Sequence, residues 1–483
     1  MKLSDLLADI PVTSMGDSVP LEIEIETVRS DSREKLEGSL FACIPGTRQD
    51  GHEFAKEASG RAAAVLVERD VGLPNQILTP NVREAYARIC GNFFGNPGRE
   101  LSLIAVTGTN GKTSVATIIH RLLNQAGIRA GLISTIQAEY GGKAFPMERT
   151  TPDAFPLQRL LAQMRDAGMT AVALEASSHA LDQERLGGLW FTVGVFTNLT
   201  QDHLDYHRTM EAYYQAKKKL FSRTAFGVLN LDDPFGRRLA EEITIPYAGC
   251  TAEGEKAEYA AEGISCGMQG VRFTLVNGPV RCPMEFGIPG VYSVQNALAA
   301  IAVCRRMGLS FGRIRAGLRE VGSIPGRSEL LASERGFQVL CDYAHTPDGL
   351  ENLLKSVRAV TNGKLTLVFG CGGDRDAGKR PLMGRAAACY ADRLILTSDN
   401  PRTEDPMEIL RQIEAGLPEG TDYRVICDRA EAIRAAVLQA EPGETVILAG
   451  KGHEQVQILG NRQIAFDERA LVRQILRETA PRA

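Results

Sequence analysis

The chain has 483 residues, which is too long for one hydrophobic core and predicts two to four domains. Hydrophobic residues make up 44% and charged residues 24%, as in ordinary soluble globular proteins. The net charge of −4 and the lack of a long basic block argue against a general nucleic-acid or membrane-surface binder, and no apolar run is long enough to span a bilayer.

The ten cysteines are scattered and form no Cys-x-x-Cys pair, which argues against a zinc site and a disulfide framework. The N-terminal residues are too polar for a signal peptide. Cys304 and Cys341 lie in apolar runs, where a reduced thiol behaves as a small hydrophobic group. A reducing, cytoplasmic location is therefore expected.

The first hundred residues alternate short apolar strands with helices. We expect strands over 40–46 and 62–68 and a helix over 81–95. The turn-forming cluster at 96–98 indicates a boundary, which predicts an N-terminal domain of residues 1–98.

The second segment, residues 99–325, alternates strands and helices in a way that predicts a parallel sheet covered on both faces. Shorter strands and many glycines over 243–290 indicate a small antiparallel addition. The expected strands are 101–108, 170–176 and 193–199, and the expected helices are 114–125, 156–168 and 291–308.

The third segment, residues 326–483, predicts a second doubly wound α/β unit, with ligand-binding loops at the carboxyl ends of its strands. The expected strands are 337–344, 365–370, 393–399, 423–428 and 445–450, and helices are expected at 347–360 and 429–440.

A glycine-rich loop, TGTNGKT (107–113), joins a predicted strand to a predicted helix. In such a loop backbone N–H groups surround phosphate oxygens, Lys112 meets the β- and γ-phosphate charge, and the Thr113 hydroxyl binds Mg²⁺. The general pattern has glycine where this chain has Val106, so a plain strand-to-helix turn with an exposed lysine is the alternative. The position between strand and helix favours nucleotide binding.

Polar side chains follow two further strands: Glu175 ends one, and His203 lies in the run after the other. Because parallel strands end at one edge of a sheet, the two side chains could complete a Mg²⁺ shell beside the nucleotide. Taken singly, each is better explained as an ordinary polar residue at a strand end. Five of the seven histidines nevertheless lie in motif-like runs, which packing does not explain; they are His179, His203, His207, His345 and His453.

Lys217 begins a run of three lysines in YYQAKKKLF (213–221). By itself this pattern predicts a helix with one solvated basic face.

Taken together and in this order, the motifs of nearly the whole chain resemble those of the Mur ligase family, most closely the members that add a diamino acid to a UDP-muramoyl dipeptide. The loop with Val106 is normal for that family. The motifs are TGTNGKTS (107–114), LEASSHALDQER (174–185), FTNLTQDHLDYH (196–207), YYQAKKKLF (213–221), DYAHTPD (342–348), GCGGDRDAGKRPLMG (370–384), DNPRTEDP (399–406) and AGKGHE (449–454).

The resemblance implies an α/β protein of three domains: a small N-terminal α/β UDP-binding domain, a central P-loop ATPase with a parallel sheet, and a C-terminal Rossmann-like domain that binds the amino acid. It implies an ATP-dependent amide ligase of peptidoglycan precursor synthesis, hence of cell wall biogenesis and cell division. The implied substrates are ATP, UDP-N-acetylmuramoyl-L-alanyl-D-glutamate and meso-2,6-diaminopimelate, with Mg²⁺ as cofactor. We expect a monomer without nucleic-acid or membrane partners.

The resemblance also implies the site residues by position. The ATP contacts are Gly108, Thr109, Asn110, Gly111, Lys112, Thr113, Ser114, Asn296, Arg327, Asp342 and His345. The UDP-dipeptide contacts are Ser30, Ser32, Thr47, Arg48, Gln49, Thr150, Thr151, Ser177, Gln183 and Arg185. The catalytic residues are Lys112, Glu175, His203 and Lys217, and the metal ligands are Thr113, Glu175, His203 and Lys217, the last as a carbamate that acts like a bridging carboxylate.

The run Asp399-Asn400-Pro401-Arg402 is by itself an Asn-Pro turn that leaves a strand. In the family this motif reads the side chain of the incoming amino acid, and an arginine suits the distal carboxylate that meso-diaminopimelate has and L-lysine lacks. Two charge-assisted hydrogen bonds, at about 1.5–3 kcal/mol each, imply discrimination on the order of 10²–10⁴. Arg375, Gly450 and Glu454 are expected to complete the pocket, with Glu454 facing the substrate's ammonium group.

Two kinds of rival remain. A lysine-adding or folylpolyglutamate-forming ligase would belong to the same superfamily, but the DNPR motif and a UDP-type N-terminal domain argue against both. A nucleotide switch without ligase chemistry would explain residues 101–230 but not the loops at 399–402 and 450–454.

Overall fold

The computed structural model describes residues 1–46, 49–254, 256–332 and 334–479. They fall into two compact units: the first has residues 1–107, 127–195 and 216–227, and the second has residues 108–126, 196–215 and 228–483. In the described part of the chain, no helix is long and apolar enough to cross a membrane.

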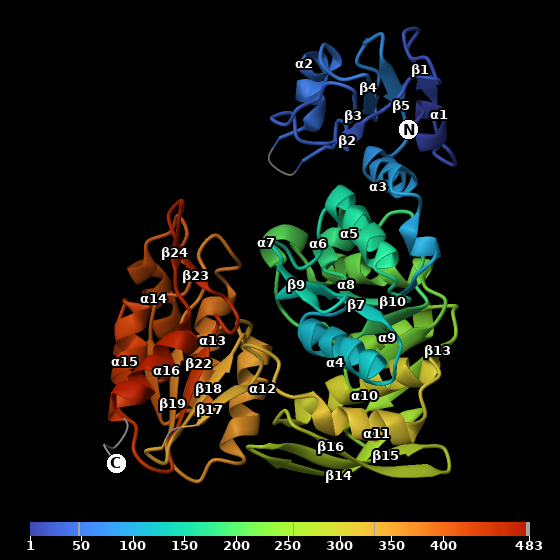
Figure 1. The fold of residues 1–483 in the computed structure, drawn as a ribbon. Coiled ribbons are helices and arrows are strands. Elements are labelled where there is room, and N and C mark those ends of the chain that lie inside the picture. Colours follow the sequence, from blue (N-terminus) through green and yellow to red (C-terminus); the bar gives the residue numbers. More distant parts are fainter. Residues whose placement is uncertain (47–48, 255, 333, 480–483) are drawn as a thin grey trace. The chain divides into compact units, whose positions relative to one another are not determined.

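The first unit begins with a five-stranded sheet in the order β1-β5-β4-β3-β2 (Figure 1). The neighbours from β2 to β5 pair in parallel, whereas β1 is antiparallel. Alternate strand residues pack on opposite faces: Leu40 and Leu66 lie with α1 and α3, and Phe41 and Val65 with α2. The elements are β1 (Ser14–Met15), β2 (Thr27–Arg29), β3 (Ser39–Ala42), β4 (Ala64–Val67), β5 (Gln76–Leu78), α1 (Leu3–Leu6), α2 (Ala55–Ser59) and α3 (Val82–Phe93).

The rest of the first unit contains strands in the order β11-β6-β10-β7-β8-β9. β10 pairs in parallel with β6 and β7, and β8 and β9 extend the edge as an antiparallel hairpin. Every residue of β10 is buried, as the apolar run predicts for a strand covered on both faces. The elements are β6 (Ser102–Thr107), β7 (Ala130–Ile133), β8 (Gln137–Tyr140), β9 (Lys143–Pro146), α5 (Ala154–Asp166), β10 (Ala171–Glu175), α6 (Ser178–Asp182) and β11 (Val193–Phe196).

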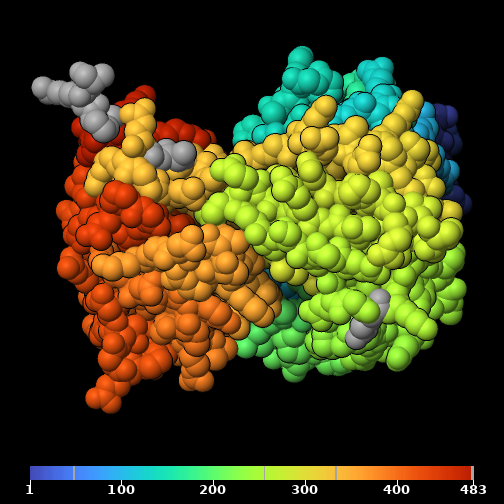
Figure 2. Space-filling model, turned by 90° about the horizontal axis from the view of Figure 1, so that it is seen from below, coloured from blue at the N-terminus to red at the C-terminus, as the bar shows by residue number. Residues whose placement is uncertain are grey.

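In the second unit, α4 (Lys112–Gln125) packs against α10 (Val291–Arg306) and α11 (Phe311–Glu320). The expected antiparallel addition is confirmed as β14-β15-β16, and its outer face is shown in yellow-green in Figure 2. Buried and exposed residues alternate along β15, because α10 lies against only one face of the addition. The other elements here are α7 (Leu204–His207), α8 (Met210–Lys218), which continues into the first unit, β12 (Gly227–Asn230), α9 (Pro234–Glu242), β13 (Tyr247–Thr251), β14 (Tyr259–Gly267), β15 (Gly270–Asn277) and β16 (Val280–Phe286).

The second unit ends in a six-stranded sheet in the order β17-β18-β22-β19-β20-β21, in which only β17 is antiparallel to its neighbour. Its strands send alternate side chains to two cores: Leu367 packs toward α12, α13 and α14, and Val368 toward α15 and α16. The elements are β17 (Glu329–Ala332), β18 (Gln338–Asp342), α12 (Pro347–Arg358), β19 (Leu365–Phe369), α13 (Lys379–Tyr390), β20 (Arg393–Leu396), α14 (Pro406–Glu414), β21 (Tyr423–Val425), α15 (Arg429–Gln439), β22 (Thr445–Ala449), the hairpin β23 (Val456–Leu459) and β24 (Arg462–Ala465), and α16 (Glu468–Glu478).

The α/β fold class is confirmed, and each strand and helix expected from periodicity has a counterpart within a few residues. The hairpin β23–β24 was not expected, because each strand has only four residues, Val-Gln-Ile-Leu and Arg-Gln-Ile-Ala, and none of them is fully buried. The domain boundaries after residues 98 and 325 stay predictions.

Candidate active site

The glycine-rich loop lies between the end of β6 and the start of α4, and its glycines are required sterically. Gly108 has φ +151°, and a Cβ there would lie 1.8 Å from the Thr197 Oγ1 atom. Gly111 has φ +86°, and a Cβ there would lie 2.5 Å from Asn296 Oδ1. Only glycine allows both the backbone angles and the close approach.

The segment after β11 holds this loop in shape. Thr109 N donates to Asn198 O at 2.9 Å, and Asn110 N donates to Asn198 Oδ1 at 2.8 Å. In return, Thr197 Oγ1 donates to Asn110 O at 2.6 Å. The run FTNLT therefore serves as a support for the loop, which sequence reasoning did not assign to it.

Lys112 Nζ donates to two carbonyl oxygens of its own loop, Gly108 O at 2.9 Å and Thr109 O at 2.7 Å. The ammonium group is thus held over the loop, where a phosphate would lie. Thr113 Oγ1 accepts a hydrogen bond from Arg327 Nη2 at 2.9 Å. Two residues that the sequence assigned to ATP, 214 positions apart in the chain, therefore meet.

Asp342, which was also assigned to ATP, lies near Arg327. The Arg327 guanidinium lies 4.6 Å from the ring centroid of Tyr343. Asp342 accepts hydrogen bonds from Ser328 N at 2.6 Å and Ala344 N at 2.7 Å. Burial raises the pKa of Asp342, and the charge of Arg327 opposes that rise.

A buried ion cluster that sequence reasoning missed centres on Asp202, which is 5% exposed. Its carboxylate lies 3.5 Å from Lys379 Nζ, 3.4 Å from His203 Nε2 and 3.6 Å from His345 Nε2. Burial alone would raise the pKa of Asp202, but the hydrogen bond from His345 and the charge of Lys379 hold that pKa well below its usual range. Both Asp202 and Lys379 stand inside motifs that the sequence singled out, which was the available signal.

In the first unit, Glu175 is fully buried and accepts hydrogen bonds from Thr135 N at 2.7 Å and Thr135 Oγ1 at 3.0 Å. The Thr135 hydroxyl also bonds Thr150 Oγ1 at 3.1 Å. Thr151 Oγ1 donates to Glu175 O at 2.7 Å and accepts from Ser177 N at 3.0 Å. Three residues assigned to the dipeptide therefore surround the proposed metal ligand.

Lys217 is 1% exposed, so the alternative of a solvated basic helix face does not hold for it. Lys219, two residues on, is exposed and pairs with Asp182 at 2.9 Å. The first and the last lysine of the run therefore differ: Lys217 is buried, whereas Lys219 is exposed to solvent. Among the described residues no group of three or more His, Cys, Asp or Glu side chains forms a metal site, and the shell of Thr113, Glu175, His203 and carbamylated Lys217 stays a prediction.

A pocket of about 430 Å³ in the first unit brings Ser30 together with Gln183 and Arg185. Arg185 donates to Gln183 Oε1 at 2.7 Å and to Thr151 O at 3.0 Å, so Arg185 joins Gln183 and Thr151 in one hydrogen-bonded group. Ser32 is not among the lining residues, and Gln49 Nε2 donates to Glu53 at 3.2 Å. Thr47 and Arg48 lie outside the described residues.

The residues assigned to the diamino acid converge in the second unit. A Cβ on Gly372 would lie 3.0 Å from Arg402 Nη1 and 3.7 Å from Arg375 Cγ, so both arginine side chains lie beside this glycine. Arg402 donates to Gly373 O at 2.8 Å and Arg375 to Asp374 O at 2.9 Å. Burial, and next the positive charge of Arg375, lower the pKa of Arg402, while the charges of nearby carboxylates oppose this shift.

The other side of this group carries negative charge. Asn400 Nδ2 donates to Glu454 Oε2 at 2.9 Å. Gly450 has φ +112°, and a Cβ there would lie 2.9 Å from Asp399 Oδ2, so glycine keeps this loop close to the DNPR turn. The arrangement offers two cationic groups and one partly exposed carboxylate, which complements a zwitterion with an extra carboxylate.

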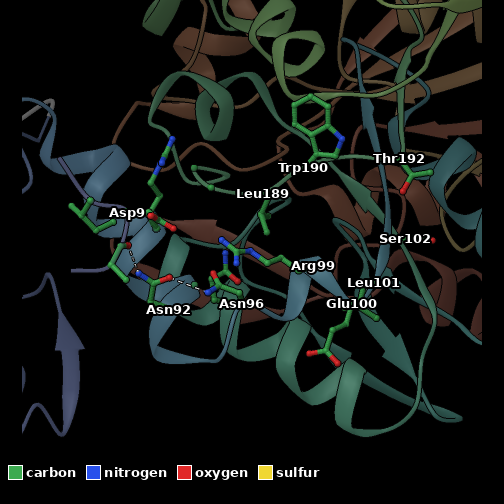
Figure 3. Close-up of a pocket in the computed structure, with 18 residues that line it drawn as sticks. Asp9, Asn92, Asn96, Arg99, Glu100, Leu101, Ser102, Leu189, Trp190 and Thr192 are labelled. Atoms are coloured by element: carbon green, nitrogen blue, oxygen red, sulfur yellow. Dashed lines mark hydrogen bonds between the residues drawn. The ribbon is translucent and has the colours of Figure 1, made fainter. Parts of the chain in front are cut away.

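A second pocket in the first unit, of about 510 Å³, lies between the end of α3, the 96–102 segment and the loop of Leu189 and Trp190 (Figure 3). Trp190, the only tryptophan in the chain, is 59% exposed there. Gln158 also lines it and is 2% exposed, and its Oε1 has no hydrogen-bond partner among the described residues. None of the predicted site residues line this pocket, so it is separate from the candidate substrate sites.

Comparison with known proteins agrees with these groupings. The models of the Mur ligase middle domain and of the Mur ligase, glutamate ligase domain match residues 106–304 and 326–452. The UDP-N-acetylmuramoyl-L-alanyl-D-glutamate--2,6-diaminopimelate ligase of Geobacillus kaustophilus is 44% identical over 493 residues, which cover 99% of this chain and 100% of the relative. The protein of the same name from Thermosynechococcus vestitus is 42% identical, with 99% and 98% covered.

Solved structures agree as well. A structure titled UDP-N-acetylmuramoyl-L-alanyl-D-glutamate--2,6-diaminopimelate ligase superposes with a TM-score of 0.70 at 32% identity and covers 99% of both chains. Folylpolyglutamate synthase of Mycobacterium tuberculosis, at 19% identity and a TM-score of 0.63 over 75% of this chain and 91% of that one, shares the fold alone. With relatives above 40% identity along almost the whole sequence, the chain belongs to the Mur ligase family.

Proposed function

We propose that the protein is an ATP-dependent amide ligase that joins meso-2,6-diaminopimelate to UDP-N-acetylmuramoyl-L-alanyl-D-glutamate. The reaction would form a UDP-muramoyl tripeptide for peptidoglycan synthesis, and so serve cell wall growth and cell division. The names of the full-length relatives support the reaction, and the two arginines beside Gly372 support the choice of amino acid.

The observation that carries the proposal is that Arg375 and Arg402 both lie beside Gly372. Each guanidinium donates to an uncharged carbonyl oxygen, so a carboxylate placed at both of them would replace an uncharged acceptor by a charged one. Diaminopimelate has such a distal carboxylate. L-lysine has no carboxylate at that end and would add no such acceptor.

The ATP side supports phosphoryl transfer. Lys112 and Arg327 would neutralise the γ-phosphate while a carboxylate oxygen of the D-glutamyl residue attacks phosphorus. The new O–P bond forms as the bond to the β-phosphate oxygen breaks, which gives an acyl phosphate and ADP. The amine of the diamino acid then attacks the acyl carbon and loses a proton, and the C–O bond breaks to release inorganic phosphate.

Mg²⁺ would be held by Thr113, Glu175, His203 and a carbamate on Lys217. The chemistry of the donors suits this ion: Glu175 is a fully buried carboxylate, and the carbamate would place a second anionic group at a fully buried position. Buried anions need a cation partner. When bound, Mg²⁺ would neutralise charge on the transferred phosphoryl group.

The UDP-dipeptide would occupy the 430 Å³ pocket of Ser30, Gln183 and Arg185. Thr150, Thr151 and Ser177 would lead from it to Glu175 through the hydrogen bonds described above. These residues all belong to the first unit, and their hydrogen bonds connect the 430 Å³ pocket to Glu175.

The proposal includes three domains, residues 1–98 for UDP, 99–325 for ATP and 326–483 for the amino acid. It also places a monomeric enzyme in the cytoplasm. The ten cysteines, all unpaired, support a reducing compartment.

The test is phosphate release from ATP with the UDP-dipeptide and a panel of meso-diaminopimelate, its LL isomer, L-lysine and L-ornithine. We expect release only when dipeptide and amino acid are both present, with meso-diaminopimelate preferred over L-lysine on the order of 10²-fold or more. Equal rates with lysine would refute the substrate. Release without any amino acid would favour a nucleotide switch.

A further inference from the structure

Lys451 is a fully buried lysine in the turn after β22. Its Nζ atom lies 3.0 Å from Asn400 Oδ1, 3.0 Å from Glu454 Oε2 and 3.5 Å from Asp399 Oδ1. An ammonium group has three donors and no acceptor, so the three contacts match its full capacity. Lys451 therefore joins the DNPR turn to the loop that carries Glu454.

These contacts determine how the Asn400 amide is oriented. Its Oδ1 atom accepts from Lys451 Nζ and from Ile458 N, each at 3.0 Å. The amide nitrogen is left to donate to Glu454 Oε2 at 2.9 Å. An amide turned the other way would set its N–H groups against two donors.

The same contacts determine which oxygen of Glu454 is available. Oε2 accepts from both Asn400 and Lys451. Oε1 accepts no hydrogen bond from any residue that the structure describes, and the side chain is 26% exposed. One oxygen is therefore held in place while the other remains for a ligand.

A second buried pair lies behind this cluster. Arg429 and Glu468, both fully buried, bond at 2.8 Å, and Arg429 also donates to Ala449 O at 2.9 Å, just before the Lys451 turn. This pair fixes the end of β22, so Lys451 enters the cluster from a rigid support.

We propose that Lys451 is a positioning residue for amino-acid recognition: it orients Asn400 and holds Glu454 Oε2, so that Glu454 Oε1 meets the ammonium group at the non-reacting end of the substrate. The inference rests on the proposed function. Lys451 acts through Glu454 and does not touch the substrate itself.

The test compares two substrates in wild type and in Lys451→Met, which keeps an unbranched side chain of nearly the same length without its charge. 2-Aminopimelate with a single amino group keeps the reacting amine and the distal carboxylate but lacks the second ammonium group. For Lys451→Met we expect KM for meso-diaminopimelate to rise about 10–100-fold, as for loss of a charged hydrogen bond, with KM for ATP within about twofold of wild type. KM for 2-aminopimelate should change little, so the preference between the two amino acids should collapse.

A merely structural role would weaken both amino acids equally, and that result would overturn the inference. A second measure compares Glu454→Gln with the double variant that also carries Lys451→Met. The double variant removes the Glu454 charge together with its Lys451 partner, which keeps the comparison open if Lys451→Met alone does not fold. The double variant should be no worse for meso-diaminopimelate than Glu454→Gln, and additive losses would refute action through Glu454. Failure of wild type to use diaminopimelate would instead refute the proposed function.

Discussion

Arg327 donates a hydrogen bond to the Thr113 hydroxyl at 2.9 Å, although 214 residues separate the two positions. A hydroxyl that accepts from a guanidinium is poorly placed to bind a metal ion as well. We therefore expect Arg327 to turn from Thr113 to the phosphate oxygens when the metal nucleotide binds. The Arg327 guanidinium stacks on the face of the Tyr343 ring, and this cation–π contact would keep the side chain near the phosphates while its donors reorient.

If Arg327 contacts phosphate, Arg327→Ala should raise KM for ATP about 10–100-fold, the worth of a charged hydrogen bond. KM for diaminopimelate should stay near wild type. Steady-state kinetics with each substrate varied in turn will measure both. Arg358→Ala, which removes an arginine paired with Asp392 at the surface, is the matched control and should leave both constants unchanged. Equal rises for ATP and the amino acid would contradict the assignment.

Arg402 is expected to set the preference for a distal carboxylate. Arg402→Ala should raise KM for diaminopimelate on the order of 10²-fold and reduce the preference over L-lysine by a similar factor. Arg402→Lys keeps the charge but not the fork of donors, so it should recover only part of the loss. The ratio of kcat/KM for the two amino acids is the measurement. A ratio equal to that of wild type in Arg402→Ala would show that another group reads the carboxylate.

Lys217 is expected to carry a carbamate. Lys217→Ala should lose most activity, and added short-chain carboxylates should restore part of it, because they can replace the missing anionic group. Lys219→Ala is the control from the same helix end: its exposed ion pair with Asp182 should matter little to activity or stability. Phosphate release with and without added acetate or propionate decides the matter, and a fully active Lys217→Ala variant would end the idea.

The Asp202 cluster predicts a pH-dependent stability. Because the folded pKa of Asp202 lies well below its unfolded value, its contribution is present above pH about 4 and is lost as the pH falls through the folded pKa. At pH 7 Asp202→Asn should be less stable than wild type by about 3 kcal/mol, since Lys379 and His345 lose a buried partner.

The difference in unfolding temperature between Asp202→Asn and wild type should therefore shrink as the pH falls from 7 to 3. Asp166→Asn removes an exposed aspartate paired with Arg165 and is the control, with little change at any pH. A gap that stays constant with pH would contradict a charged Asp202.

The sequence by itself determined the α/β class, the position of most strands and helices, and the phosphate loop. These depend on local patterns. Periodic apolar residues select strand or helix within ten or so residues, and Gly108 and Gly111 are needed wherever a chain turns this tightly. The DNPR turn could also be found from sequence, because an Asn-Pro step leaving a strand is a short-range signal.

Only the tertiary structure decided which lysine of the 217–219 run is buried, that Asp202 meets Lys379, and that Lys451 supports Asn400 and Glu454. The physical reason is that burial and charge pairing depend on residues brought together from distant parts of the chain. A lysine in a helical sequence pattern looks the same whether its ammonium group is solvated or pairs with a carboxylate. Only the folded structure determines which of the two applies.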